Sequence, residues 1–381
     1  MPLRGLSRRW RSGCGRAWRR REALWCVSKT IEPTGGGLMT DGRTPRLTLA
    51  QIAETAGVSV STVSKVLNGR DDVSRDTRAR VDAVLRGHHY VRRGAPEPAA
   101  VGVRTVDLVL GGIDGSWPAS VASGMEAAAH EAGLHVVISV ARTPTGEGRH
   151  AQDWVDRALE RGSSGVVVGL AEPSDDQLAR LARARIPCVV IDPLSDPPPG
   201  VWSVGTTNWS GAYEATSHLL DLGHRRIGLV TGPPGHLFAR ARIAGYRSAL
   251  SATDVDAPPE LLRHGTYDRD SGREQVRALL ALPEPPTALF VCSDHMAIGG
   301  YAALAEAGLR VPDDVSVVGF DDLPEARWVT PPLTTVRQPL KEMGGNALRV
   351  LARLIAGEDV ESPRVELATT LVPRGSTAPR G

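Results

Sequence analysis

The sequence predicts an α/β protein with a small all-helical domain near its N-terminus and a larger body of two lobes, each a parallel sheet flanked by helices. Three observations lead to this prediction. Residues 47–92 show helical periodicity with closely spaced helix-ending signals, and residues 105–372 alternate short apolar runs with amphipathic stretches. The formal charge also changes sign, from +3 over residues 39–92 to −8 over residues 93–381. A basic module on an acidic body is typical of a polyanion-binding domain joined to a domain with another task.

Composition excludes several classes of protein. The 381 residues are 41% apolar and 23% charged, which is typical of a globular chain of roughly two to three domains. No apolar run approaches the roughly 18 residues of a membrane span, so we expect a soluble, cytoplasmic, nucleoid-associated protein. The four cysteines lack CxxC spacing, and Cys188 and Cys292 lie in apolar runs. We therefore expect core thiols, with no disulfide framework, metal site or cofactor.

A basic segment precedes the first periodic region. Residues 1–38 carry a formal charge of +7 and three tryptophans, without the continuous apolar region of a secretory signal. Interleaved arginine and tryptophan could bind a nucleic acid, but unpatterned basic tracts seldom specify a structure. We expect residues 1–46 to be an unstructured leader and Met39 to be the true start.

Helix signals begin at Thr48, which is placed to cap the helix AQIAETA. Gly57 supplies a left-handed residue that ends this helix, and Ser59 caps a second helix, VSTVSKVL. A third helix over residues 75–90, capped by Ser74, would complete a small core. Two short helices across a three-residue turn predict a helix-turn-helix, whose second helix lies in the DNA major groove.

The outward positions of the second helix are candidate DNA contacts. Lys65 can donate to guanine O6 and N7, Ser61 can pair with several base edges, and Val60 offers apolar contact to a thymine methyl. The remaining DNA-binding candidates are better suited to phosphates or to the start of the first helix: Thr62, Ser64, Asn68 and Thr48. The alternative is an ordinary polar face of a helical bundle. It is disfavoured because the turn, the caps and the basic balance agree with DNA binding.

The segment LTLAQIAETAGVSVSTVSKVLNG, followed by DVSRDTRARV and Tyr90, resembles the DNA-binding domain of the lactose/galactose repressor family. The resemblance implies a regulator that binds a pseudo-palindromic double-stranded DNA operator as a homodimer. It also implies that Val60, Ser61 and Lys65 read the bases, the same positions that the helix geometry selects.

The linker over residues 93–104 departs from the family pattern. In many members this stretch folds on DNA into a hinge helix whose leucine enters the minor groove. Here there is no leucine, and Pro96 and Pro98 would interrupt a helix that included them. Val101 or Val103 could act as a shorter wedge, although a plain flexible linker is equally well supported.

The body predicts two parallel sheets. The expected strands are residues 106–112, 135–141, 165–170, 186–192, 226–232, 287–293 and 315–321. Strands that alternate with helices indicate parallel sheets covered on both faces. Ligands of such sheets bind outside the carboxyl ends of the strands, and between two lobes those ends face one cleft.

The segments HLLDLGHRRIGLVTGP, ARARIAGYRSAL and PPLTTVRQP resemble signatures of the family's effector domain, which is similar to periplasmic sugar-binding proteins. The resemblance implies a periplasmic-binding-protein-like fold whose chain crosses between lobes three times. One lobe is then expected from residues 105–204 and 312–338, and the other from residues 205–311 and 339–372, followed by a tail over residues 373–381.

The resemblance also implies ligand contacts. Arg240, in ARARIAGY, matches an arginine that binds sugar hydroxyls; Asp294, in CSDHMAIG, matches the carboxylate opposite it; and Asp192 matches a further pocket position. Arginine and carboxylate groups pair with vicinal hydroxyls, while aromatic rings pack on the apolar face of a sugar. Weaker candidates near strand ends are Arg142, Trp117, Trp202 and Tyr267. The alternatives are a surface role for Arg240 and a core role for the tryptophans.

No P-loop, G-x-G-x-x-G, G-x-S-x-G or H-E-x-x-H motif occurs, so we expect no enzymatic activity. The sequence predicts an allosteric DNA-binding repressor controlled by a sugar or oligosaccharide. By analogy with regulators of plant-polysaccharide use, xylobiose and cellobiose are candidates. The alternatives are a corepressor-dependent regulator that senses a non-sugar metabolite, or a sugar-binding protein or enzyme without a DNA role. One further departure is Asn208, where many relatives carry aspartate.

Overall fold

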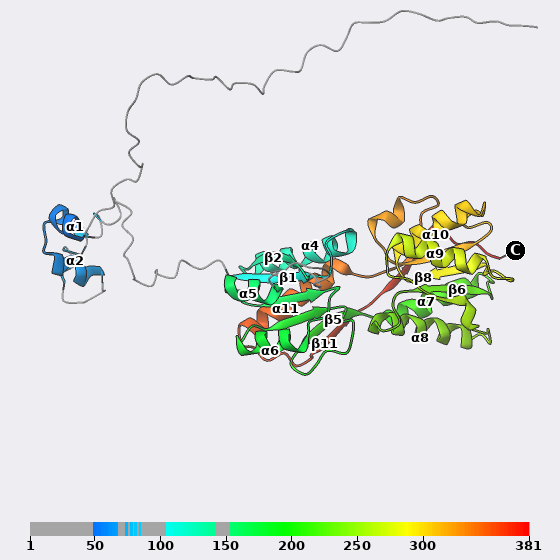
Figure 1. The fold of residues 1–381 in the computed structure, drawn as a ribbon, viewed down its shortest axis with the longest axis horizontal. Helices are drawn as coiled ribbons and strands as arrows, with labels where there is room; N and C mark the ends of the chain where they lie inside the picture. The colour runs from blue at the N-terminus through cyan, green and yellow to red at the C-terminus, as the bar shows by residue number, and fades with distance from the viewer. Residues whose placement is uncertain are drawn as a thin grey trace, which may run out of the picture. The chain divides into compact units, whose positions relative to one another are not determined.

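A computed structural model describes residues 49–67, 73–74, 77–78, 80–81, 84, 104–141 and 153–380 (Figure 1). The chain divides into two compact units, an N-terminal unit (Met1–Glu97) and a C-terminal unit (Pro98–Gly381). The predicted leader, almost all of the predicted linker, and the candidates Thr48, Asn68 and Arg142 lie outside the described residues. Within the described ranges, no helix has both the length and the apolar character needed to span a bilayer.

The N-terminal unit contains the predicted helix-turn-helix. Helix α1 runs over Leu49–Ala56 and α2 over Val60–Leu67 (Figure 1). Gly57 between them has a φ of +66°, and Val58 N–H donates to the Ala53 carbonyl at 2.9 Å. The Ser59 hydroxyl accepts from Thr62 N–H at 3.2 Å, so Ser59 caps α2 as predicted.

A small apolar core joins these helices to a third helical segment. Ser74 accepts from Thr77 N–H at 3.2 Å and so caps this segment, in which residues 77–78, 80–81 and 84 are helical. The core residues are Ile52, Ala53, Ala56, Val63, Val66 and Val81, with Val58, Val73 and Val84 packed against them. This core packs the described part of a third helix against α1 and α2, as predicted, while most of the expected range of residues 75–90 lies outside the described residues.

The first lobe of the C-terminal unit is built on a parallel six-stranded sheet in the order β11-β5-β4-β3-β1-β2. Its strands are β1 (Thr105–Leu110), β2 (His135–Val140), β3 (Val166–Gly169), β4 (Cys188–Ile191), β5 (Trp202–Thr206) and β11 (Arg364–Leu367). Its helices are α4 (Ser116–Glu131), α5 (Trp154–Arg161), α6 (Asp175–Arg183) and α11 (Leu340–Ile355). One apolar cluster joins the sheet to α4 and α11, and another joins it to α5 and α6. Both faces of the sheet are therefore covered.

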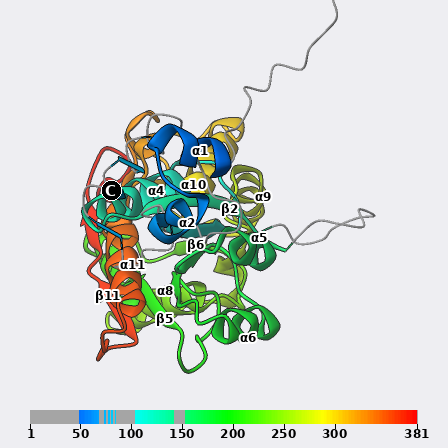
Figure 2. The ribbon, with the colours of Figure 1, turned by 90° about the vertical axis from the view of Figure 1, so that its left-hand side faces the viewer.

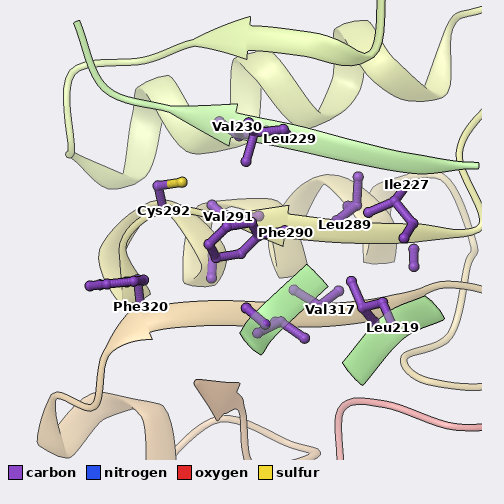
Figure 3. Packing of buried hydrophobic residues seen from close by; sticks show 14 of the residues in the cluster. Leu219, Ile227, Leu229, Val230, Leu289, Phe290, Val291, Cys292, Val317 and Phe320 are labelled. Carbon is purple, nitrogen blue, oxygen red and sulfur yellow. The ribbon is translucent and has the colours of Figure 1, made fainter. Parts of the chain in front are cut away.

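The second lobe contains another six-stranded sheet, in the order β12-β10-β9-β8-β6-β7. Its strands are β6 (Ile227–Thr231), β7 (Leu262–His264), β8 (Ala288–Val291), β9 (Ser316–Asp321), β10 (Thr334–Arg337) and β12 (Thr370–Val372), of which only β12 pairs antiparallel. Its helices are α7 (Asn208–Asp221), α8 (Leu237–Ser251), α9 (Arg269–Leu280) and α10 (Asp294–Glu306), with short 3-10 turns η1 (Pro259–Leu261) and η2 (Pro324–Arg327). Leu229, Phe290 and Phe320 lie in the buried cluster at its centre (Figure 3).

The predicted division of the chain between the lobes was wrong at its C-terminal end. Residues 312–338 contain β9 and β10, which belong to the second sheet, because β9 pairs with β8. Residues 339–367 contain α11 and β11, which belong to the first lobe (Figure 1), because α11 packs on α4 and β11 pairs with β5. Both elements lie on the left-hand side of the view in Figure 2. The chain does cross between lobes three times, near residues 207, 339 and 368.

The segment predicted as a tail is an integral part of the second lobe. Ser376 is fully buried, and its hydroxyl donates to the Val317 carbonyl at 2.6 Å and accepts from Thr334 N–H at 2.7 Å. Arg380 N–H donates to the Leu222 carbonyl at 2.7 Å. Residues 373–380 therefore satisfy polar groups along β9 and β10 that would otherwise be buried without partners.

Candidate functional site

The exposed face of α2 carries the predicted base-reading residues. Val60 is 46% exposed, and Ser61 and Lys65 are also exposed, whereas Val63 and Val66 on the opposite face are buried. An exposed valine on a short helix has no role in the small core of this unit. The arrangement fits a recognition helix, and the individual base and phosphate contacts stay predictions.

A cavity of about 200 Å³ lies between the two lobes of the C-terminal unit. We call it the interlobe cavity. Its lining comes mainly from residues at or just after the carboxyl ends of strands, as parallel sheets predict. The lining residues are Asp114, Trp117, Pro118, Leu170 and Asp192 from the first lobe, and Phe238, Arg242, Tyr267, Ser293, His295, Asp321, Leu323 and Gln338 from the second.

Arg242 is the arginine of this cavity. Its side chain is 2% exposed; Nε donates to Asn208 Oδ1 at 2.8 Å and a terminal nitrogen donates to the Cys292 carbonyl at 2.7 Å. Its guanidinium carbon lies 3.7 Å from the Phe320 ring centroid. These contacts hold the guanidinium plane in one orientation within a poorly hydrated environment.

The predicted contact from Arg240 is not supported. Arg240 is exposed on α8 and does not line the interlobe cavity. Residues two apart on a helix project about 200° from each other, so only one arginine of ARAR can face the cavity. The family resemblance selected Arg240, whereas the structure places Arg242 at the cavity, and ligand binding by either arginine stays a prediction.

Two buried carboxyl groups line the cavity with Arg242. Asp192, predicted as a pocket residue, is 5% exposed, and burial raises its pKa to about 7 against the lowering influence of Arg242. Burial likewise raises the pKa of Asp321 to about 6, with Arg242 again acting in the opposite direction. Gln338 Nε2 donates to Asp321 Oδ1 at 2.6 Å. Burial and Arg242 therefore act in opposite directions on the pKa of both carboxyl groups.

Asp294 does not line the cavity, contrary to the prediction. Its carboxylate is fully buried and accepts hydrogen bonds from Leu323 N–H at 2.7 Å and from the Thr335 hydroxyl at 2.6 Å. Burial raises the pKa of Asp294 well above its ordinary value. The residue therefore ties α10 to β10 and to the loop after β9, while Asp321 of the GFDD segment supplies the carboxyl group inside the cavity.

Trp117 and Tyr267, which were predicted as ligand contacts, line the interlobe cavity, and their contact with a ligand stays a prediction. The Tyr267 ring lies 5.6 Å from Phe238 and stacks on His236 at 6.1 Å. Its hydroxyl is buried and has no hydrogen-bond partner among the described residues. Trp202 does not reach this cavity and lines a separate depression with residues of α6 and α11.

Non-glycine residues with positive φ cluster at the cavity. Leu170 (53°), Asp192 (45°), Tyr267 (68°) and Asp321 (114°) all line it. Such conformations are costly for residues with a Cβ and gather at ligand sites where the surrounding fold maintains them.

A series of hydrogen bonds connects the cavity to two of the segments where the polypeptide crosses between the lobes. Asn208 accepts from Arg242 and donates through Nδ2 to the Thr206 carbonyl at 3.1 Å. The Thr206 hydroxyl donates to Gln338 Oε1 at 2.7 Å, and Gln338 in turn donates to Asp321. Because Asn208 is neutral, it positions Arg242 without cancelling its charge. The departure from aspartate at this position was visible in the sequence, but its contact with Arg242 was not.

Further contacts join the lobes beside the cavity. The Ser116 hydroxyl donates to Glu325 Oε1 at 2.7 Å, and Leu237 N–H donates to the Leu194 carbonyl at 2.7 Å. Each bond links a first-lobe residue to a second-lobe residue. Opening the cavity would therefore break specific hydrogen bonds at its edges.

Comparisons with known proteins agree with both units. Residues 48–93 match the family model described as bacterial regulatory proteins, lacI family, and residues 216–377 match that of a periplasmic binding protein-like domain. The HTH-type transcriptional repressor PurR of Mannheimia succiniciproducens is 30% identical over 333 residues, which cover 86% of this chain and 98% of that protein.

The solved structures that share the fold include two ligand-bound regulators. The complex of the transcriptional regulator CelR with cellobiose has a TM-score of 0.65 and 33% sequence identity, covering 87% of this chain and 100% of that one. A lac repressor dimer bound to operator and the anti-inducer ONPF has a TM-score of 0.66 and 31% identity, covering 88% and 100% of the two chains.

Proposed function

Because this chain belongs to the lacI family of bacterial regulatory proteins, which are transcriptional regulators and not enzymes, we propose that a carbohydrate in the interlobe cavity controls its binding to DNA. The protein acts as a dimer on a pseudo-palindromic operator, with the two α2 helices in successive major grooves. The similar lac repressor structure, a dimer on operator, supports this arrangement.

The observation that carries the carbohydrate proposal is the combination of charged hydrogen-bonding groups and aromatic faces in one cavity. Asp192, Asp321 and Arg242 offer acceptors and donors that suit hydroxyl pairs on the edge of a sugar ring. Trp117 and Phe238 offer apolar surfaces that suit the C–H faces of the ring. The cellobiose complex of the similar regulator CelR supports the same class of ligand.

Control of DNA binding follows from the placement of these groups on different lobes. A ligand that bonds to Asp192 on the first lobe and to Arg242 and Asp321 on the second binds most tightly when the lobes are closed. The hydrogen bonds from Asp321 through Gln338 to Thr206 link the site to the segments that cross between the lobes. The effector thereby biases the lobe arrangement, and we expect it to release DNA.

The test begins with selection of an operator from random duplex DNA, followed by fluorescence anisotropy with a panel of saccharides. Arg242→Ala should keep operator binding and lose the saccharide response. Arg240→Ala, exposed two residues away on the same helix, is the matched control and should respond like the wild type.

Three outcomes would contradict the proposal. Selection that yields no preferred sequence excludes a sequence-specific repressor, and a normal response in Arg242→Ala excludes this pocket assignment. A ligand that strengthens DNA binding, and is not a sugar, would instead identify a corepressor-dependent regulator.

A further inference from the structure

A second cavity of about 160 Å³ adjoins the interlobe cavity and shares Asp192 and Phe238 with it. We propose that the two cavities form one site, and that the effector has at least two linked sugar rings, the second of which packs on Trp209. This inference rests on the proposed carbohydrate control and specifies the size of the ligand.

The volumes favour a joint site. Pockets for small-molecule ligands usually have volumes of about 300–1,000 Å³. The interlobe cavity, at about 200 Å³, and the second cavity, at about 160 Å³, each fall below this range, whereas together they reach it. A ligand confined to the interlobe cavity would leave the adjoining space to water.

Trp209 supplies an aromatic platform in the second cavity. It is the second residue of α7, it is 44% exposed, and it lines this cavity. Its ring stacks on Tyr213 with 5.2 Å between centroids and 17° between planes. Because Tyr213 covers one face, the opposite face and the edges are left for a ligand, and the stack fixes the orientation of the indole.

Polar groups surround this platform. Ser210 lies beside Trp209, and β11 brings Arg364 and Glu366, both exposed, to the same cavity. Arg364 also pairs with Asp196 at 3.3 Å, which restrains its side chain. An apolar ring face with donors and acceptors at its rim is the combination that a pyranose or furanose ring requires.

Asp192 lies where the two cavities meet. It is almost fully buried and lines both of them, so its two oxygens can accept hydroxyl hydrogens from rings on either side. A carboxylate at this position would recognise the region of the glycosidic bond between two rings. A single ring in the interlobe cavity would use only part of this capacity.

The test is titration calorimetry of the full chain with two matched pairs of sugars, cellobiose with glucose and xylobiose with xylose. At least one disaccharide should bind about tenfold or more tightly than its monosaccharide, as expected for an added aromatic contact. In Trp209→Ala the ratio of the monosaccharide dissociation constant to the disaccharide dissociation constant should fall about tenfold. Trp209→Phe should restore most of the disaccharide's advantage.

Trp328→Ala is the matched control, because Trp328 is 73% exposed and lines neither cavity. It should leave both dissociation constants unchanged, and melting curves should show that each variant folds. If the disaccharide has no advantage, or if Trp209→Ala keeps the wild-type ratio, the second subsite is refuted while carbohydrate control still stands. Failure of the wild type to bind any of the four sugars would refute both proposals.

Discussion

Replacing Asp192 by asparagine should stabilise the C-terminal unit, and should do so more at pH 8 than at pH 5. Asp192 is 5% exposed, and burial raises its pKa from the ordinary 3.8 to about 7. The folded state therefore holds a proton on this group that the unfolded state releases. The contribution of Asp192 to the free energy of unfolding therefore falls as pH rises from about 4 to about 7, and the full cost of ionising this group is present above that range.

The size of the effect follows from this shift. Each pKa unit corresponds to about 1.4 kcal/mol, so the ionised carboxylate costs up to about 4 kcal/mol at pH 8. At pH 5 about 1.5 kcal/mol of this cost is already present, because unfolded aspartate is largely ionised there. The stabilisation by Asp192→Asn should thus be about 2–3 kcal/mol larger at pH 8 than at pH 5.

Urea unfolding followed by circular dichroism at both pH values measures this difference. Asp196→Asn is a matched control four residues away, because Asp196 has a side chain that is 73% exposed. It should show no comparable pH dependence. Equal stabilisation by Asp192→Asn at the two pH values, or a loss of stability at pH 8, would refute the burial argument.

Three further predictions concern other parts of the molecule. Lys65→Ala should cost about 1–3 kcal/mol at one base pair of the selected operator, and equal losses on all sequences would make Lys65 a phosphate contact. Asn208→Asp should weaken carbohydrate binding severalfold in calorimetry, because a carboxylate competes for Arg242 and cannot donate to the Thr206 carbonyl; unchanged affinity would contradict this reasoning. Truncation after Val372 should lower the free energy of unfolding by at least about 3 kcal/mol in urea, since it removes the partners of Thr334 N–H and the Val317 carbonyl, and wild-type stability would contradict the structural role of these residues.

The central strands could be predicted because parallel strands buried on both faces are continuous apolar runs, as in ALFV of β8. Strands that escaped prediction lack such runs. β10, with the sequence TTVR, buries threonines through specific hydrogen bonds, and β11 alternates exposed and half-buried residues at a sheet edge. Apolar patterning identifies a strand but not its partner, so the division between lobes rested on the family resemblance alone. That division placed residues 312–338, and residues 339–367 of the expected 339–372, in the wrong lobes.

The candidate site was predicted in outline but not in its details. Asp192, Trp117 and Tyr267 lie in the interlobe cavity, whereas Arg240 and Asp294 lie outside it. The arginines of ARAR differ only in which side of α8 they occupy, and that depends on how α8 packs against α7. The buried position of Asp294 depends on Thr335 and Leu323, which come from segments distant in the sequence.

The four residues with positive φ at the interlobe cavity have a consequence for the kinetics of ligand binding. Each such conformation costs about 1–3 kcal/mol, which the fold of each lobe bears whether or not a ligand is present. At these four positions of the described structure, the ligand therefore meets a backbone that already holds its conformation. Closure of the site then moves one lobe against the other, a motion on the microsecond to millisecond scale. We therefore expect association to include a step in which the lobes close, with the lifetime of the closed state setting how long the effector stays bound.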